Sequence, residues 1–337
     1  MKQKDITRGE NGVVTSSHEL KSVSLRQREL LDIVETAAEN SQSDNTRRSY
    51  EYSWDVFDRF CESMRLIALT AEPMTVALFL ADQYQNNLSV STLSQRIAAI
   101  RSMHLGNDYL SPTDSEFVKD KMKGFRNLKG TKQSAPKDPA TEDVIIAMLD
   151  AIDTSTLLGM RDRALLLYGY AGALRRSELV GIDVEHIKPV PLGHELTIPR
   201  SKGDQQAKGQ KIGVMARSGS PLCPTSAVDE WLKASGIQKG SVFRRFYKND
   251  TLGATRLGDK TVERLVKELA FRIGLSMDRF AAHSLRSGFL TSAADSGARW
   301  DKLREHARHR RLDTTAGYIK SRELFDDHAG ARLDEES

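Results

Sequence analysis

The sequence predicts a mainly helical protein of two domains: an N-terminal all-α helical bundle and a mainly α C-terminal domain with a small antiparallel β-sheet. Three observations support this prediction. The chain has 337 residues, a length typical of two domains that each bury a core. Apolar residues recur at spacings of three and four along most of it, which is the helical period. Residues 194–215 instead alternate on both sides of a turn, as a β-hairpin does.

The composition is that of an ordinary globular protein, with 39% hydrophobic and 28% charged residues. No run of about 18 apolar residues could span a membrane, and residues 1–20 lack the apolar core of a secretory signal. Cys61 and Cys223 are far apart and have no metal-type spacing, which suits a reducing cytoplasm. We therefore expect a cytoplasmic protein with no membrane partner. Its net charge of +4 permits nucleic acid as a partner without requiring it.

The first domain is predicted to be a bundle of four helices at residues 26–128, after a polar, mobile tail at residues 1–25. Each helix is identified by one apolar stripe, and Asp44 or Ser43 can cap the first. The stripes are Tyr50, Trp54, Phe57, Cys61 and Met64 from Asn45 onward; Val76, Leu80 and Tyr84 after Pro73; Leu93, Ile97, Ile100 and His104 from about Ser91; and Phe117, Met122 and Phe125 within residues 112–127.

Three clusters of cations lie on the polar faces of these helices. A single cluster is more often a solvated face, but three in one small bundle favour a surface that follows the phosphates of a nucleic acid. We expect the polar side of the third helix to enter the major groove of DNA and to read bases through Thr92, Gln95 and Arg96. The clusters are Arg47 with Arg48; Arg96 with Arg101; and Lys121 and Lys123 with Lys119 and Arg126.

Residues 129–141 contain glycine, two prolines and lysines but no apolar pattern, so they are predicted to form an interdomain linker. The second domain follows at residues 142–319, ahead of a C-terminal segment at 320–337. Its hairpin has a long basic tip that contains Lys202. Its helices are expected at 142–152, 161–174, 225–235, 258–273, 284–295 and 299–306, and the nearly apolar second one should lie at the domain centre.

Separate elements of the second domain carry polar residues that folding alone would not require. Arg175 and Glu178 are three residues apart beside the most apolar helix, so they face the same way. A plain structural ion pair explains them equally well. His283 and Arg286 lie on the first turn of another predicted helix, where main-chain N–H groups favour an anion. The alternative there is a capping histidine beside a surface arginine.

The remaining candidates are Lys202 at the hairpin tip, His309, and Tyr318 nine residues after it. Lys208 is an alternative to Lys202, and a lone lysine in a loop usually serves solubility alone. His306 and His309 have the spacing of a metal pair, but no carboxylate or cysteine ligand is evident nearby. We therefore expect no metal site.

Together these residue types match the attack of a phenol on a phosphodiester, with no metal or other cofactor. The guanidinium groups of Arg175 and Arg286 fit the geometry of non-bridging phosphate oxygens. His309 can donate to the same oxygens, and a cationic pocket lowers the pKa of a tyrosine from about 10. A lysine or histidine can protonate the leaving alkoxide. Tyr318 would form a covalent phosphotyrosyl link that conserves the bond energy.

The order and spacing of these motifs resemble those of the tyrosine recombinase (phage integrase) family. The motifs are LRRSEL, the hairpin lysine in RSKGD, HSLR, and a histidine nine residues before a tyrosine. The likeness covers roughly residues 27–337. The helical N-terminal part, with LSVSTLSQRIAAIRSMH, and the short tail after Tyr318 look most similar to the Cre-type members. Each motif alone is weak, but five in order with this spacing, with the histidine and the tyrosine counted separately, are specific.

The resemblance implies a SAM-like helical domain and a catalytic domain that clamp double-stranded DNA. It implies a dimer on each inverted-repeat recombination site, and a homo-tetramer that exchanges strands through a 3′-phosphotyrosyl intermediate and a Holliday junction. It further implies that residues 320–337 dock in a neighbouring protomer, and that the protein is associated with the nucleoid. The site residues that it implies are Arg175, Lys202, His283, Arg286 and His309 around the nucleophile Tyr318, with Glu178 supporting the pocket.

One position departs from the family pattern. The family usually has glycine just before the histidine that matches His309, and this chain has Arg308. Glycine permits a left-handed turn there, so the departure concerns the local backbone geometry. We expect Arg308 and Arg310 to add contacts to phosphates.

Three other functions share part of this pattern. A type IB topoisomerase uses similar chemistry but relaxes DNA, and here the separate helical domain and the short segment after Tyr318 favour recombination. A non-catalytic DNA-binding protein on the same fold would normally have lost one or more of the six site residues, and all six are present. A metal-dependent nuclease would need clustered carboxylates, which the sequence does not contain.

Overall fold

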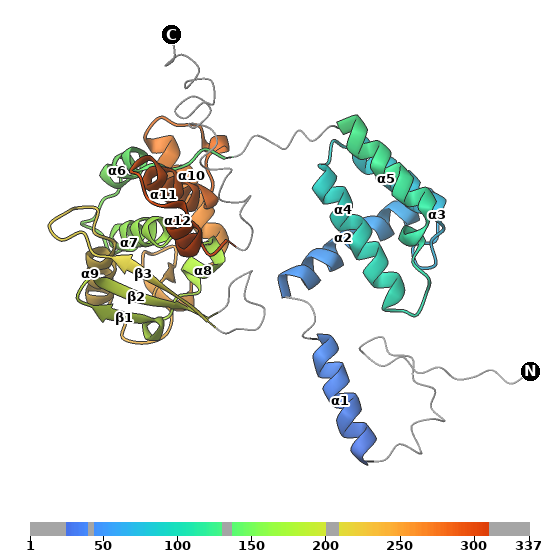
Figure 1. Cartoon of the computed structure of the whole chain (residues 1–337), viewed down its shortest axis with the longest axis horizontal. Coiled ribbons are helices and arrows are strands. Elements are labelled where there is room, and N and C mark those ends of the chain that lie inside the picture. Colours follow the sequence, from blue (N-terminus) through green and yellow to red (C-terminus); the bar gives the residue numbers. More distant parts are fainter. Residues whose placement is uncertain (1–24, 40–43, 130–136, 200–208, 310–337) are drawn as a thin grey trace, which may run out of the picture. The chain divides into compact units, whose positions relative to one another are not determined.

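The computed structural model describes residues 25–39, 44–129, 137–199 and 209–309. The chain divides into two compact units, Met1–Ala135 and Pro136–Ser337, and the division falls within the stretch expected to be the linker. Each unit has a hydrophobic core of its own. Figure 1 shows the helical first unit and the mixed second unit.

The first unit contains the four predicted helices. Pro73 occupies the first position of its helix, where a missing N–H costs nothing. The Ser89 hydroxyl caps the next helix by accepting the Thr92 N–H at 3.1 Å. The bounds are α2 Asp44–Met64, α3 Pro73–Gln85, α4 Val90–Leu105 and α5 Glu116–Lys129, with a short 3-10 helix at Pro112–Asp114.

Aromatic rings from α2 and α3 meet in the core of the first unit, where the Phe57 and Phe79 centroids are 5.1 Å apart. Two residues of the predicted stripes are exposed. Met64 is 53% exposed because α2 ends there and the chain turns at Arg65, whose φ is 55°. Phe117, in the first turn of α5, is 38% exposed. The helix α1 (Leu25–Glu39) was not predicted, and its side chains Leu30, Leu31, Ile33 and Val34 are exposed.

The second unit is mainly helical with two small antiparallel sheets, as expected of its fold class. The strand order of the larger sheet is β1-β2-β3, and β4 pairs with β5. The bounds are α6 Glu142–Asp150, α7 Leu157–Ala171, α8 Arg176–Val180, β1 Ile187–Val190, β2 Gly193–Ile198, β3 Gln210–Met215, α9 Pro224–Ser235, β4 Arg244–Phe246, β5 Leu252–Arg256, α10 Asp259–Arg272, α11 His283–Asp295 and α12 Trp300–Ala307.

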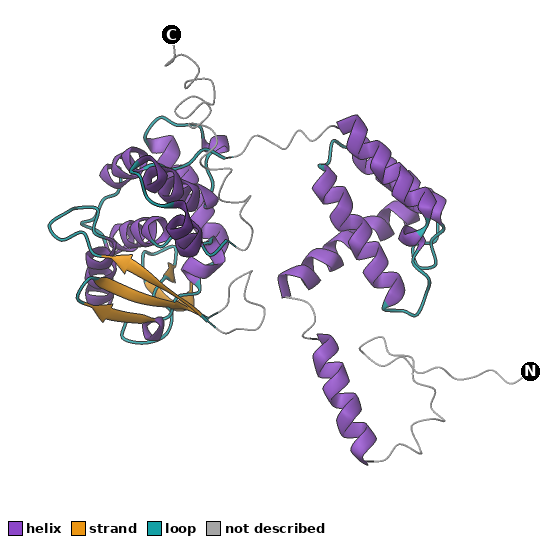
Figure 2. Ribbon diagram, viewed as in Figure 1, coloured by secondary structure: helices purple, strands orange, loops and turns teal. Residues whose placement is uncertain are grey.

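Helix α7 lies at the centre of the second unit, as its apolar sequence predicts, and residues 164–166 are fully buried. The three-stranded sheet lies to one side of the helices (Figure 2). Buried His194 of β2 joins the sheet to two helices, because its ring nitrogens lie 3.4 Å from Tyr168 Oη of α7 and from an Asp229 carboxylate oxygen of α9. The β2–β3 hairpin was predicted, whereas the short strands β1, β4 and β5 were not.

Helix α11 is packed directly against the beginning of the second unit. The Ala140 N–H donates to Ser284 O at 2.9 Å. A Cβ on Gly288 would lie 1.8 Å from Ala140 O, so only glycine permits this approach of the two backbones. The contact fixes the position of the helix that begins with His283.

No helix in the described ranges is long and apolar enough to cross a membrane.

Candidate active site

The first part of the site is the entry to α8. Arg175 immediately precedes the helix, and its N–H donates to Glu178 Oε2 at 2.9 Å. Its Nη1 also donates to Glu178 Oε1. The Glu178 side chain is 1% exposed and that of Arg175 is 26% exposed. The carboxylate therefore holds the arginine by main chain and side chain while the guanidinium still reaches solvent.

The second part is the first turn of α11, where His283 and Arg286 lie as predicted. Arg286 is 1% exposed, and its Nη1 donates to Ala173 O at 2.6 Å while its Nη2 donates to Ala307 O. Ala173 has a φ of 44°, in the left-handed region, and its carbonyl is used by this arginine. Main-chain carbonyls orient the Arg286 guanidinium without cancelling its charge.

The third part is the end of α12. His306 Nε2 donates to Ala171 O at 2.8 Å, and its ring packs on Phe289 with the centroids 4.8 Å apart. These contacts indicate a structural role for His306. The helix ends at Arg308 in a left-handed conformation, with φ 57° and ψ 42°, and His309 follows with its N–H donating to Arg304 O at 3.2 Å.

The two histidines of the site are kept neutral by their surroundings. Burial lowers the pKa of His309 to about 4, and the charges of Arg286 and Arg175 act in the same direction. His283 is exposed, yet the protein packed around its ring lowers its pKa, and Arg286 and Arg175 lower it further. A neutral imidazole donates one N–H, so at pH 7 both rings act as hydrogen-bonding groups rather than as cations.

Stability of the free protein should fall as the pH decreases from about 6.5 to about 4. In this window the unfolded chain protonates His309, whereas the folded chain, with its lowered pKa, does not. His283 and His306 also have lowered pKa values and contribute in the same direction. Melting temperatures measured from pH 4.5 to 7.5 should rise with pH, and His309→Gln should make the slope shallower. An identical slope in the variant would contradict the lowered pKa.

The structure brings together Arg175, Glu178, His283, Arg286 and His309. Lys202, Arg310 and Tyr318 lie outside the described residues, so their roles stay predictions. In the first unit, Arg47, Arg48, Gln95, Arg101, Lys121 and Lys123 are exposed and Thr92 is half-buried, and their DNA contacts also stay predictions. Arg101 pairs with Asp114 at 3.0 Å.

Two arginines expected to contact DNA have a different environment. Arg96 is 6% exposed, and its guanidinium lies 5.7 Å from the centroid of the Tyr52 ring and 5.9 Å from that of Phe79. It lies inward because α2 and α3 pack on both sides of it, so we do not retain base reading for it. The Arg308 side chain is 3% exposed and pairs with Glu178, so it is not a surface cation.

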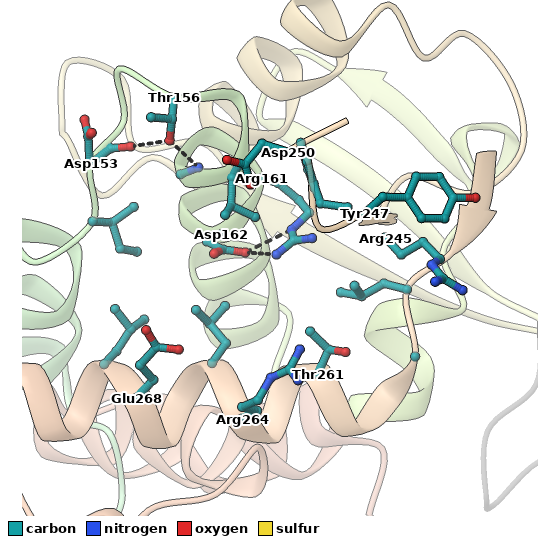
Figure 3. Close-up of a pocket in the computed structure, with 18 of the residues that line it drawn as sticks. Asp153, Thr156, Arg161, Asp162, Arg245, Tyr247, Asp250, Thr261, Arg264 and Glu268 are labelled. Atoms are coloured by element: carbon teal, nitrogen blue, oxygen red, sulfur yellow. Dashed lines mark hydrogen bonds and ion pairs between the residues drawn. The ribbon is translucent and has the colours of Figure 1, made fainter. Parts of the chain in front are cut away.

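A separate cavity of about 840 Å³ lies between α7, the β4–β5 hairpin and α10, as Figure 3 shows. An ion pair between Arg161 and Asp162 spans 2.6 Å within it. The cavity is lined by none of the residues of the site above, and we assign it no part in their chemistry. Within the described ranges, no three His, Cys, Asp or Glu side chains are grouped so that they could hold a metal ion.

Comparison with known protein families adds independent information. The model described as "Phage integrase family" matches residues 140–324, and the model described as "Phage integrase, N-terminal SAM-like domain" matches residues 35–106. An integrase/recombinase xerD homolog from Selenomonas ruminantium is 33% identical over 298 residues, covering 88% of this chain and 87% of the relative. A tyrosine recombinase XerC from Myxococcus xanthus is 27% identical, covering 84% and 89%.

Solved structures are similar in fold. The Tn1549 transposon integrase in complex with transposon right end DNA has a TM-score of 0.58 at 16% identity, covering 89% of this chain and 96% of that one. The XerH site-specific recombinase bound to difH substrate has a TM-score of 0.56 at 18% identity, covering 82% and 78%.

Proposed function

This chain belongs to the phage integrase family, and we propose that it is a site-specific DNA recombinase that works through a 3′-phosphotyrosyl intermediate. Enzymes of this family are tyrosine recombinases, which cleave and rejoin DNA. The observation that carries the proposal is the cluster in which Arg175 and Arg286 lie close enough to two histidines to lower their pKa values. It supplies fixed positive charge and N–H donors for the oxygens of one phosphate.

The proposed first step is the attack of Tyr318 Oη on a DNA phosphorus. The phenol proton of Tyr318 passes to a neutral histidine of the cluster as the tyrosine oxygen forms a bond to phosphorus. The bond to the 5′-oxygen breaks, and Lys202 or the histidine that has become protonated gives that oxygen a proton. Arg175 and Arg286 would hold the non-bridging oxygens, whose charge increases in the transition state. In the reverse step a 5′-hydroxyl displaces the tyrosine and the DNA is rejoined. No metal or nucleotide enters either step.

We propose the assembly of the protein on its DNA site from the family resemblance. A dimer would occupy each inverted-repeat site, and two dimers would form a tetramer that exchanges strands through a Holliday junction. Residues 320–337 carry an apolar set, Leu324, Phe325, Ala329 and Leu333, within an acidic segment. We propose that they dock in a neighbouring protomer. Ending the chain after Ile319 should then preserve binding to one site while removing the higher-order complexes seen in gel-shift experiments.

DNA binding should weaken steeply with salt. The first unit presents Lys121 and Lys123 on α5, and neutralising several phosphates releases their counterions. Between 50 and 200 mM salt the affinity should fall on the order of 10³-fold, as expected for about six phosphate contacts. Lys123→Ala should reduce the slope by about 1, whereas Lys119→Ala, whose ammonium pairs with Glu116 at 2.7 Å, should change it less. Fluorescence anisotropy at a series of salt concentrations measures both, and a flat affinity would contradict a phosphate-following surface.

The function is tested by strand exchange. DNA retained by the purified protein from its source genome supplies the candidate site, and two copies are placed on one plasmid. In EDTA and without ATP, the protein should produce recombined products only when both copies are present. Relaxation of plasmids without a site would favour the topoisomerase alternative, and a requirement for Mg²⁺ in cleavage would favour a nuclease. Binding without cleavage of any substrate would favour a non-catalytic DNA-binding protein.

A further inference from the structure

Arg308 occupies the position at which the family resemblance predicts glycine, and its side chain turns inward. Its Nη2 donates to Glu178 Oε2 at 2.9 Å and to Ala173 O at 3.0 Å. Its Nη1 donates to His306 O at 2.8 Å and to Gly172 O at 3.3 Å. Four oxygens from three separate segments therefore hold one guanidinium, although its backbone is left-handed.

The carboxylate of Glu178 consequently lies between two arginines. Arg175 donates to it from the partly exposed side, and Arg308 pairs with it from the buried side. Burial alone would raise the pKa of Glu178, but the charge of Arg308 and the hydrogen bonds from Arg175 outweigh burial and leave the pKa below its ordinary value. Glu178 is therefore ionised, and the three groups together carry one positive charge.

We propose that Arg308 is a positioning residue that balances the charge of Glu178, so that Glu178 can hold Arg175 in place without cancelling the charge that Arg175 offers to a phosphate. With a neutral residue at position 308, the Arg175–Glu178 pair would have no net charge. Glu178 would then hold Arg175 back from an anion. This role rests on the proposed function, because it assumes that Arg175 meets a DNA phosphate.

The second arginine of the cluster is linked to the same arrangement. Arg286 and Arg308 both donate to the carbonyl of Ala173, from α11 and from the end of α12. Arg308 therefore also fixes the carbonyl that orients Arg286. The inward side chain explains why a non-glycine residue is accepted in the left-handed conformation here: its contacts with Glu178 and three carbonyls offset the strain.

Inorganic phosphate is the probe for this charge balance, because it needs no DNA site. Phosphate affinity is measured by calorimetry at constant ionic strength with Arg308→Met, which retains the length of the side chain and removes its charge. Loss of one charge a few ångströms behind the anion should weaken phosphate binding about fivefold. Adding Glu178→Gln to this variant restores the net charge beside Arg175, so the double variant should recover most of the affinity.

Further variants distinguish charge balance from direct contact with the anion and from packing. Arg308→Lys keeps the charge with fewer donors and should bind phosphate nearly as the unmodified protein does. Arg299→Met removes an exposed arginine at the other end of α12, with a side chain that is 79% exposed, and should leave the affinity unchanged. If Arg308 itself contacted the anion, Glu178→Gln would not restore binding to Arg308→Met. If Arg308 served only packing, Arg308→Met would lower the melting temperature without changing the phosphate affinity.

The same variants are then compared on a nicked DNA substrate that contains the candidate recombination site found in the DNA retained by the purified protein. Arg308→Met should slow covalent adduct formation about tenfold, an effect of the size that is common when the residue that orients a ligand-contacting side chain is removed. The double variant should recover part of the rate. Equal phosphate affinity and equal rate in Arg308→Met and the unmodified protein would overturn the inference while leaving the recombinase proposal intact. No phosphate binding by the unmodified protein, together with no adduct, would overturn both.

Discussion

Tyr318→Phe should abolish the covalent protein–DNA adduct that the unmodified protein forms on a nicked substrate. The substitution removes one oxygen, which is the proposed nucleophile, and retains the aromatic ring. DNA affinity and melting temperature should therefore remain close to those of the unmodified protein. The loss should be complete within the sensitivity of a denaturing gel, because no weaker nucleophile can replace a phenol held beside the phosphorus.

The matched control is Tyr247→Phe. Tyr247 follows β4, is 45% exposed and stacks with Arg245, whose guanidinium carbon lies 4.8 Å from its ring centroid. Removing its hydroxyl should leave adduct formation unchanged. An adduct with Tyr318→Phe, at any rate near that of the unmodified protein, would show that another residue is the nucleophile.

Arg286→Ala is expected to slow cleavage by about 10² or more, the effect of losing one preorganised donor to a developing oxyanion. The side chain is buried and held by two main-chain carbonyls, so its direction is fixed before the substrate binds. Arg286→Lys keeps the charge but loses the planar fork, and should recover only part of the rate. Single-turnover cleavage of the nicked substrate measures this loss.

Arg176→Ala is the control for Arg286→Ala. Arg176 adjoins the site in sequence, yet its side chain points to α10, where it pairs with Asp259 and Glu263 at 3.0 Å. Arg176→Ala should slow cleavage by less than a tenth of the factor by which Arg286→Ala slows it. Similar losses in the two variants would indicate that cleavage depends on total positive charge rather than on an oriented guanidinium.

Much of the architecture could be predicted from local patterns. The apolar run of α7 and the alternation of β2 and β3 are properties of adjacent residues, so the sequence identifies them directly. The position of His283 and Arg286 on the same helix face follows from their spacing of three residues, which is about one helical turn. Strands β1, β4 and β5 have only three to five residues, too few to show a period. Helix α1 was not predicted, and its apolar side chains Leu30, Leu31, Ile33 and Val34 are exposed rather than packed in a core.

Two arginines that were expected on the surface are buried, because their surroundings depend on tertiary packing. Arg308 meets Glu178, which lies 130 residues earlier, and no local signal connects the two. The one local signal was the absence of glycine at a turn that favours it, and this signal does not say where the side chain goes. Arg96 lies on a helix face that the sequence pattern makes polar, but α2 and α3 cover it with Tyr52 and Phe79. In both cases the charge alone suggested a surface position.

The central claim is that this chain joins itself to DNA through Tyr318 without a metal. The most direct test is to trap the adduct on a nicked substrate in EDTA, digest it with nuclease and trypsin, and locate the nucleotide by mass spectrometry. We predict that the added mass lies on the peptide LDTTAGYIK, residues 312–320, and that fragmentation places it on Tyr318. A nucleotide on any other residue, or cleavage without an adduct and only when Mg²⁺ is supplied, would contradict the account.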